Sequence, residues 1–228
     1  MIVALDVENV AGALQLVEKI GSAANFYKVG MELYAAAGME IVSQLSSFGK
    51  NVFLDLKLYD IAETVRRATR QICKNGAPDF LTVHGSRTIM QAAVEGRGDS
   101  QTKLLGVTVL TSFDQEDLAD LGFSVPVGDL VELRVRKAVE SGIDGVVCSP
   151  LEIARVRQAG GPKLSIVTPG VRSSGADAGG QKRVATPAEA IRNGADYLVI
   201  GRQVTRAANP EAACQEILAE LGSVARGA

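Results

Sequence analysis

Short runs of Val, Ile, Leu and Phe recur along the chain, and polar residues do not alternate with the apolar ones within them. Continuous apolar runs of this length are typical of parallel strands that are buried on both faces, because crossover helices cover such a sheet. The runs lie at 2–7, 26–30, 52–56, 80–83, 104–110, 145–148, 164–167 and 197–200. This pattern predicts eight parallel strands.

The stretches between the runs have the amphipathic spacing of surface helices. In 61–74 the apolar residues recur every three or four positions, and three arginines lie on the other side. The apolar residues are Ile61, Val65, Ala68, Ile72 and Cys73. A second helix is predicted from Leu130, Leu133, Ala138 and Val139. We therefore expect crossover helices that cover the outside of the sheet.

Helix ends are visible as local signals. Helices are expected to stop at glycines that stand just before strands, and to start where a capping residue precedes proline. The stop signals are Gly49, Gly76, Gly142, Gly160 and Gly194, and the start signals are Ser149-Pro150 and Thr186-Pro187-Ala188-Glu189. The second start signal also has the glutamate of a capping box. These signals separate the predicted strands and helices.

Eight strand–helix units follow one another without a linker or low-complexity segment. Such an alternation favours a closed (β/α)8 TIM barrel over an open doubly wound sheet, and the first strand is not followed by the GxGxxG of a dinucleotide-binding fold. We expect residues 1–228 to form a single catalytic barrel domain.

Composition narrows the classes of function. The 228 residues carry 24 Lys plus Arg and 26 Asp plus Glu, a net charge of −2, which disfavours binding to nucleic acid or to an acidic membrane. The three cysteines have neither disulfide nor zinc spacing, and no apolar run reaches about 18 residues. We expect a cytoplasmic protein that is neither exported nor membrane-bound.

Charged residues in buried strands are the strongest chemical signal. Active sites of (β/α)8 barrels lie at the C-terminal ends of the strands, where Asp6 and Lys28 belong to the first two apolar runs. Asp55 and Lys57 lie two apart in the third run, which places both on one face of a regular strand. Buried charges cost several kcal/mol each unless they are paired. The pattern indicates a preorganised charged array in which Lys57 supplies a cation and a proton, or alternatively a structural salt bridge.

The last two strands carry the features of a phosphate site. Thr168-Pro169-Gly170-Val171-Arg172 follows the seventh run, a glycine-rich stretch leads to Gln181, and Gly201-Arg202 follows the eighth. Barrels often hold phosphate at these two loops, and the guanidinium fork of arginine suits a phosphate dianion. His84, the single histidine, ends the fourth run, where an orienting or structural role is favoured over a catalytic one.

These residues resemble the orotidine 5′-phosphate decarboxylase family over nearly the whole chain. The most specific motif is Asp-x-Lys-x-x-Asp-Ile, formed by Asp55, Lys57, Asp60 and Ile61. The other matching motifs are Val109-Leu110-Thr111-Ser112, Thr168-Pro169-Gly170-Val171-Arg172, Gln181-Lys182-Arg183-Val184 and Tyr197-Leu198-Val199-Ile200-Gly201-Arg202. The resemblance implies decarboxylation of orotidine 5′-monophosphate to uridine 5′-monophosphate in pyrimidine biosynthesis, without a metal or organic cofactor.

The resemblance also implies a role for each matching residue. Lys57 is expected to protonate the pyrimidine carbon that loses carbon dioxide, within a catalytic array of Lys28, Asp55, Lys57 and Asp60. Ribose contacts are implied for Asp6 and Lys28, pyrimidine contacts for Thr111 and Ser112, and contacts on the phosphate side for Gln181, Gly201 and Arg202. Arg172 is expected to help the closing loop grip the phosphate, and Pro169 is expected to bind substrate. Asp60, Ile61 and Thr64 are expected to reach the site of a neighbouring subunit, so that the working unit is a homodimer with shared active sites.

Three positions depart from the commonest family pattern. Ser173 and Gln203 stand where proline is frequent, and Gly180 stands where an acidic residue often precedes the glutamine. None of these changes removes a chemical group named above. They bear on the conformation and the closing rate of the glycine-rich loop.

Two alternatives remain open at this stage. A metal-dependent sugar-phosphate decarboxylase or synthase of the same barrel group resembles this chain in its Asp-x-Lys-x-x-Asp strand, but it has an acidic metal ligand where this chain has Lys28. A catalytically silent phosphate sensor would keep Arg202 but lose the buried charges. The sequence also leaves open whether Asp55 destabilises the bound substrate or acts on the transition state.

Overall fold

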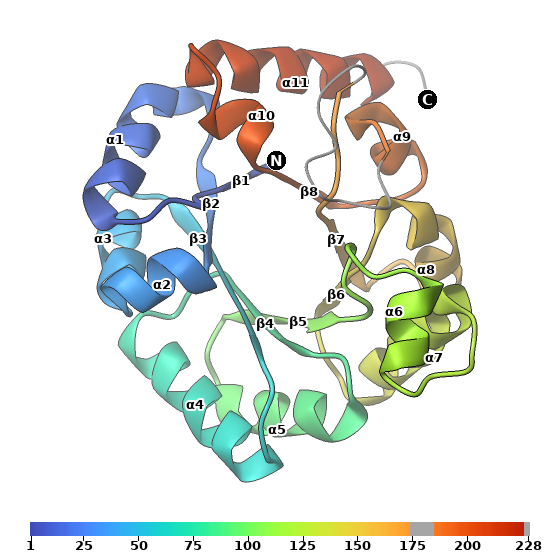
Figure 1. Ribbon diagram of the computed structural model, residues 1–228. Helices are drawn as coiled ribbons and strands as arrows, with labels where there is room; N and C mark the ends of the chain where they lie inside the picture. The colour runs from blue at the N-terminus through green and yellow to red at the C-terminus, as the bar shows by residue number, and fades with distance from the viewer. Residues whose placement is uncertain (174–184, 226–228) are drawn as a thin grey trace.

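The predicted barrel is confirmed by the computed structural model, which describes residues 1–173 and 185–225, with side chains up to residue 222. Within these ranges eight parallel strands pair in chain order, and β1 pairs with β8 to close the sheet (Figure 1). The strands are β1 (Ile2–Ala4), β2 (Phe26–Gly30), β3 (Asn51–Leu58), β4 (Phe80–His84), β5 (Lys103–Val107), β6 (Gly145–Val147), β7 (Ser165–Thr168) and β8 (Tyr197–Ile200).

Helices surround the barrel as the amphipathic pattern predicts (Figure 1). They are α1 (Val10–Ile20), α2 (Met31–Ala37), α3 (Glu40–Ser47), α4 (Ala62–Asn75), α5 (Arg87–Arg97), α6 (Gln115–Asp120), α7 (Val127–Glu140), α8 (Ile153–Gly160), α9 (Pro187–Arg192), α10 (Arg202–Thr205) and α11 (Pro210–Ala225). Two 3-10 turns lie at Gly21–Ala23 and Pro150–Glu152. None of the helices in the described ranges has both the length and the apolar character that a membrane span needs.

Two apolar layers stabilise the fold. The larger layer fills the space between the sheet and the helices, and a smaller one fills the inside of the barrel. At the N-terminal ends of the strands the inner layer ends in packed rings, with centroids 5.0 Å apart for Phe26 and Phe80 and 5.0 Å apart for Phe80 and Tyr197. Aromatic packing closes this end, so a ligand can enter the barrel only from the C-terminal ends of the strands.

Carboxylates lock the register of neighbouring strands at the closed end. Asp79, Asp144 and Asp196 stand just before β4, β6 and β8, and each accepts a backbone N–H from the preceding odd-numbered strand. The donors are Val52 at 2.7 Å, Leu104 at 2.8 Å and Ile166 at 2.7 Å. A one-residue slip of any of these strands would leave both a carboxylate and an N–H without the partner seen here.

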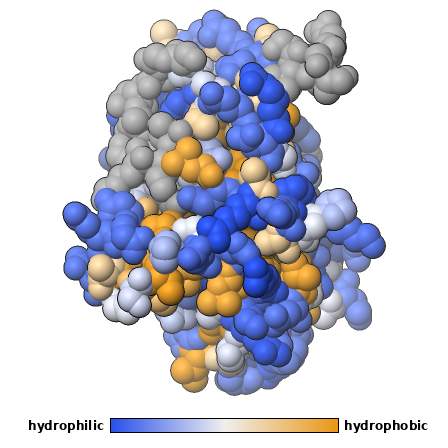
Figure 2. Space-filling model, turned by 90° about the vertical axis from the view of Figure 1, so that its right-hand side faces the viewer, coloured by the Kyte–Doolittle hydropathy of each residue, from blue (hydrophilic) through white to orange (hydrophobic). Residues whose placement is uncertain are grey.

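Several predicted boundaries and faces are wrong. The first and fifth strands end at Ala4 and Val107, three residues earlier than predicted, because the chain leaves the sheet to line the mouth of the barrel. In α7, Leu133 and Val139 are about half exposed, at 52% and 50%. The helix instead buries Leu130, Val131, Val135 and Ala138, and Figure 2, which views this side, shows apolar groups scattered among hydrophilic ones.

The predicted helix ends are mostly confirmed. Thr186 forms the expected capping box with Glu189, and Ser149 caps the turn that begins at Pro150. The exception is Gly160, which is the last residue of α8, whereas Gly161 supplies the left-handed cap with a φ of 75°. Ile61 precedes α4 instead of packing under it and is 72% exposed.

Candidate active site

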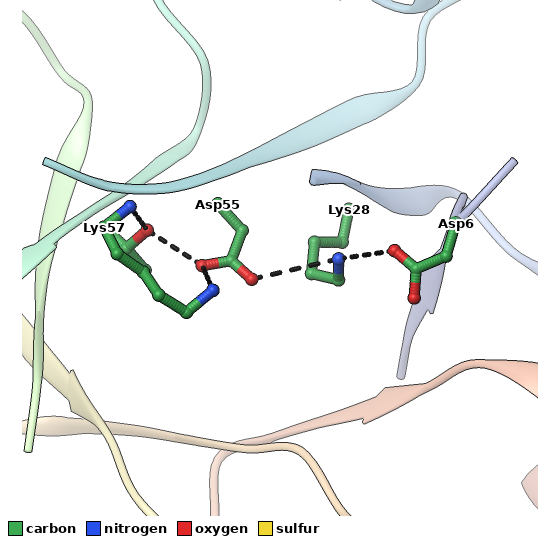
Figure 3. A network of polar contacts seen from close by, with 5 residues as sticks. Asp6, Lys28, Asp55 and Lys57 are labelled. Atoms are coloured by element: carbon green, nitrogen blue, oxygen red, sulfur yellow. Dashed lines mark hydrogen bonds and ion pairs between the residues drawn. The ribbon is translucent and has the colours of Figure 1, made fainter. Parts of the chain in front are cut away.

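Four charged side chains of alternating sign form a line across the open end of the barrel (Figure 3). Lys28 Nζ on β2 lies 2.9 Å from Asp6 Oδ1, which follows β1, and 3.8 Å from Asp55 Oδ2 on β3. Lys57 Nζ on β3 lies 2.9 Å from Asp55 Oδ1. We call Asp6, Lys28, Asp55 and Lys57 the charged quartet. Lys28 and Asp55, in the middle of the line, each contact a side chain of opposite charge on both sides.

The backbone of β3 departs from a regular strand at the quartet. The pairing of β3 with β4 shifts between Leu54 and Leu58, and Lys57 has a φ of 51°. A left-handed φ costs a non-glycine residue about 1–3 kcal/mol and is typical of functional sites. Asp55 and Lys57 therefore meet as predicted, but the reason given from the sequence is wrong, because a bulge and not regular alternation brings them together.

Thr82 on β4 holds this bulge and was missed by the sequence analysis. Its Oγ1 accepts the Lys57 N–H at 2.9 Å and donates to Asp55 Oδ1 at 2.9 Å. The threonine is fully buried within an apolar strand. A buried hydroxyl needs a hydrogen-bond partner, so a threonine within this apolar run is the sequence signal that could have identified Thr82. Thr82 connects the backbone of the lysine to the carboxylate that the same lysine contacts.

Exposure falls toward the middle of the quartet. The side chains of Lys28 and Asp55 are 11% and 14% exposed, compared with 33% for Lys57 and 58% for Asp6. Two cations and two carboxylates balance in charge, which offsets part of the cost of removing them from water. The arrangement holds one ammonium group, that of Lys57, partly open to the cavity.

A cavity of about 280 Å³ lies over the quartet. Its polar lining includes predicted substrate-binding residues from opposite sides of the barrel, and much of its apolar lining comes from the inner layer, namely Ala4, Val107, Val147 and Val199. The predicted residues in the lining are Asp6, Lys28, Asp55, Lys57, Thr111, Ser112, Pro169, Arg172 and Gly201. The structure thus gathers residues from the ends of six strands around one small apolar and polar space, as small-molecule sites require.

The predicted phosphate residues lie at the exits of β7 and β8. The Arg172 N–H donates to Ala185 O at 3.0 Å, and Arg172 lines the cavity. Arg202 is exposed and begins α10 directly after Gly201, which also lines the cavity. Gln181 lies outside the described residues. The two arginines therefore stand on neighbouring segments at one side of the cavity mouth.

Asp60, Ile61 and Thr64 lie away from the quartet, in the segment between β3 and α4 and in the first turn of α4. All three are exposed, and Asp60 Oδ1 accepts the Ile61 N–H at 2.6 Å. Tyr59 and Ile61 on either side of Asp60 are 68% and 72% exposed. Among the described contacts none joins Asp60 to the quartet of the same chain.

His84 lies beside this segment and is absent from the cavity lining in the described part of the chain. Its ring stacks on Tyr59 with centroids 4.0 Å apart, and its buried Nδ1 has no hydrogen-bond partner. Burial, followed by the charge of Arg134, lowers the pKa of His84 to about 4. The imidazole is therefore neutral at pH 7 and contacts the segment that carries Asp60.

Metal ligands do not gather in the described part of the chain. No group of three His, Cys, Asp or Glu side chains there has the spacing of a metal site. The three cysteines carry free thiols, and Cys148 and Cys214 are buried. The described polar side chains that line the cavity are the charged quartet, Thr111, Ser112 and Arg172.

Comparisons with known proteins agree with this site. The family described as "Orotidine 5'-phosphate decarboxylase / HUMPS family" matches residues 1–217. Orotidine 5′-phosphate decarboxylase of Rhodopseudomonas palustris strain BisB5 is 51% identical over 97% of this chain and 94% of its own length. The same enzyme of Nitrobacter winogradskyi is 52% identical over 99% of this chain and 94% of its own length.

A solved structure agrees as well. The crystal structure of orotidine 5′-phosphate decarboxylase from Lactobacillus acidophilus superposes with a TM-score of 0.85 at 35% identity, covering 96% of this chain and 97% of that one. Both the sequence match and the shared barrel extend across the strands that carry the quartet. The chain belongs to the orotidine 5′-phosphate decarboxylase / HUMPS family.

Proposed function

We propose that this protein converts orotidine 5′-monophosphate to uridine 5′-monophosphate and carbon dioxide. The observation that carries the proposal is the charged quartet at the open end of the barrel, with the Lys57 ammonium held 2.9 Å from Asp55 and partly open to the cavity. The relatives named above are called orotidine 5′-phosphate decarboxylases, which supports the same reaction.

In the proposed step the bond between C6 and the carboxylate carbon breaks, and its electron pair stays on C6. Carbon dioxide leaves, and C6 takes a proton from Lys57 Nζ, which becomes a neutral amine and regains a proton from solvent. In this proposal no cofactor accepts the electron pair that remains on C6. Fixed positive charge therefore has to stabilise the developing carbanion. Lys57 supplies both this charge and the proton.

Asp55 has two proposed effects, one on Lys57 and one on the substrate. Its Oδ1 holds the Lys57 ammonium at 2.9 Å, and the same oxygen accepts the Thr82 hydroxyl. The same negative charge disfavours a second carboxylate beside it, so loss of carbon dioxide relieves a repulsion. Lys28 and Asp6 complete the balance of charge and are proposed to contact the ribose.

The remaining contacts are proposed from the family resemblance. Thr111 and Ser112 line the cavity and are proposed to contact the pyrimidine edge, and Pro169, which also lines it, is proposed to bind substrate. Arg172, Gly201 and Arg202 are proposed to hold the phosphate, together with Gln181. Arg172 and Arg202 lie at the exits of β7 and β8, where barrels commonly bind phosphate. Phosphate contacts far from C6 let binding energy lower the barrier of the chemical step.

Asp60 is proposed to act in the site of a second subunit of a homodimer. In its own chain its described contacts leave it apart from the quartet, and exposed Tyr59 and Ile61 stand on either side of it. Large apolar side chains that are exposed next to a carboxylate are typical of a surface that another protein covers. Ile61 and Thr64 belong to the same proposed interface.

The first test is the loss of ultraviolet absorbance of orotidine 5′-monophosphate with the purified protein in excess chelator, with the product identified by mass. Conversion to uridine 5′-monophosphate is expected under these conditions. Activity that appears only after magnesium is added, with sugar phosphates as substrates, would support the metal-dependent alternative instead. Lys28 argues against that alternative, because its ammonium occupies the place of an acidic metal ligand and repels a divalent cation.

Shared active sites are tested by mixing two inactive variants, Lys57→Ala and Asp60→Ala. In a mixed dimer one site carries both defects and the other carries neither, so random exchange restores about a quarter of the wild-type activity. Light scattering before and after mixing reports whether dimers form. No recovery after demonstrated subunit exchange would refute the proposed role of Asp60 in the second subunit.

A further inference from the structure

A second polar cluster lies beside the two arginines, and the proposed reaction does not use it. Gln203 on α10 makes two hydrogen bonds with Ser173: its Nε2 donates to Ser173 Oγ at 2.8 Å, and its Oε1 accepts the Ser173 N–H at 3.2 Å. Ser173 Oγ donates to Glu220 Oε2 on α11 at 3.0 Å. We call Ser173, Gln203 and Glu220 the anchoring triad.

The triad joins segments that are far apart in sequence. Ser173 directly follows Arg172 at the exit of β7, and Gln203 directly follows Arg202 at the start of α10. Glu220 Oε1 also accepts the N–H of Ala188 in α9 at 3.4 Å. Figure 1 shows α9, α10 and α11 close to the ends of β7 and β8. The triad thus links the chain positions next to both arginines to the outer helices.

The described surroundings show why such a link matters. On the inner side, Arg172 is held through its own N–H by Ala185 O, and Val171 forms a bridge with Ala185. On the other side, two hydrogen bonds between Ser173 and Gln203 join the exit of β7 to α10. The two segments are therefore tied to each other at the residue that directly follows each arginine.

We propose that the anchoring triad is a positioning element that sets the spacing between Arg172 and Arg202 for the 5′-phosphate of the substrate. The inference rests on the proposed phosphate site. The triad does not touch the phosphate in this proposal; it acts through the two arginines. By holding both segments in place before the ligand arrives, it lowers the ordering cost of binding.

The two hydrogen bonds depend on the chemistry of both positions. A proline at position 173 would have no N–H to donate, and a residue without a side-chain amide at position 203 would make neither bond. Ser173 and Gln203 therefore form one structural unit, because each supplies the partner of the other.

The test uses Ser173→Ala, Gln203→Met and the double variant. Methionine keeps the approximate length of glutamine but makes neither hydrogen bond. Binding is measured by calorimetry with uridine 5′-monophosphate and with uridine, and turnover with orotidine 5′-monophosphate and with its phosphate-free nucleoside. We expect each single variant to weaken binding of the phosphorylated ligand by about tenfold while binding of uridine stays unchanged.

The double variant tests whether the triad acts as a unit. If it does, the double variant binds no more weakly than the weaker single variant, because either change already breaks the link. Gln215→Met on the exposed side of α11 is the matched control and is expected to bind both ligands like the wild type. Equal losses for uridine and its phosphate, or full affinity in the double variant, would overturn the proposal.

The binding measurements keep this inference separate from the proposed reaction. A protein that binds uridine 5′-monophosphate in a triad-dependent way but does not decarboxylate orotidine 5′-monophosphate would refute the reaction and leave the positioning role standing. If the protein decarboxylates orotidine 5′-monophosphate equally well with and without the triad, the reaction stands and the positioning role is refuted. A lower melting temperature in the variants without a phosphate-specific loss would mean a purely structural role and would also overturn the proposal.

Discussion

The charged quartet predicts stability effects of unequal size for its two members on β3, Asp55 and Lys57. Asp55→Asn removes a negative charge that faces two ammonium groups, at 2.9 Å for Lys57 and 3.8 Å for Lys28. Lys57→Met removes one of those cations and leaves Asp55 with Lys28 and the Thr82 hydroxyl. The first change leaves the Lys57 ammonium without a carboxylate partner in the quartet, whereas the second leaves Asp55 with both the Lys28 ammonium and the Thr82 hydroxyl.

The magnitudes follow from burial and from the contacts that are lost. Removing one partner of a buried ion pair costs about 3–5 kcal/mol, and a hydrogen bond to a charged group contributes about 1.5–3 kcal/mol. Because the Lys57 side chain is 33% exposed, water screens part of its charge. We therefore expect Asp55→Asn to lower the free energy of unfolding by about 3 kcal/mol, and Lys57→Met by less than about 1 kcal/mol.

Urea unfolding at one fixed protein concentration measures both values, because the apparent stability of an oligomer depends on concentration. Asp120→Asn, which changes an exposed carboxylate at the end of α6, is the control and should have little effect. The double variant Asp55→Asn with Lys57→Met should regain part of the stability lost by Asp55→Asn alone. A Lys57→Met variant that loses as much stability as Asp55→Asn, or an Asp55→Asn variant that loses none, would contradict the proposed pairing in the quartet.

Three further predictions concern activity and pH. Lys57→Ala should nearly abolish turnover without unfolding the protein, and steady-state kinetics that show most activity retained would contradict its role as proton donor. Arg202→Ala should raise KM for orotidine 5′-monophosphate much more than for the phosphate-free nucleoside; an equal rise for both would contradict a phosphate contact. For His84, burial lowers the pKa to about 4 from 6.5, so the unfolded chain takes up the proton first as the pH falls. Stability should therefore fall between pH 6.5 and pH 4 by up to roughly 3 kcal/mol, and His84→Phe should remove this component in unfolding titrations.

Much of the fold could be predicted because it depends on local patterns. Apolar runs without alternation indicate strands covered on both faces, and the capping box at Thr186 is local chemistry. The ends of strands were predicted less well, since the place where Val107 leaves the sheet depends on the curvature of the closed barrel and not on the residues of β5 alone. The exposed face of α7 was missed for a similar reason, because α8 and α5 decide which of its apolar residues are covered.

The sequence by itself determined the barrel class, the family resemblance and the identity of the charged residues, since these depend on composition, periodicity and motif order. The tertiary structure alone decided how the charges meet: the left-handed backbone at Lys57, the Thr82 hydroxyl that holds the bulge, and the Ser173–Gln203 pair. The Thr82 and Ser173 contacts join residues that lie 25 and 30 positions apart in the sequence. Local patterns do not encode such contacts, because closure of the barrel sets the distances between elements.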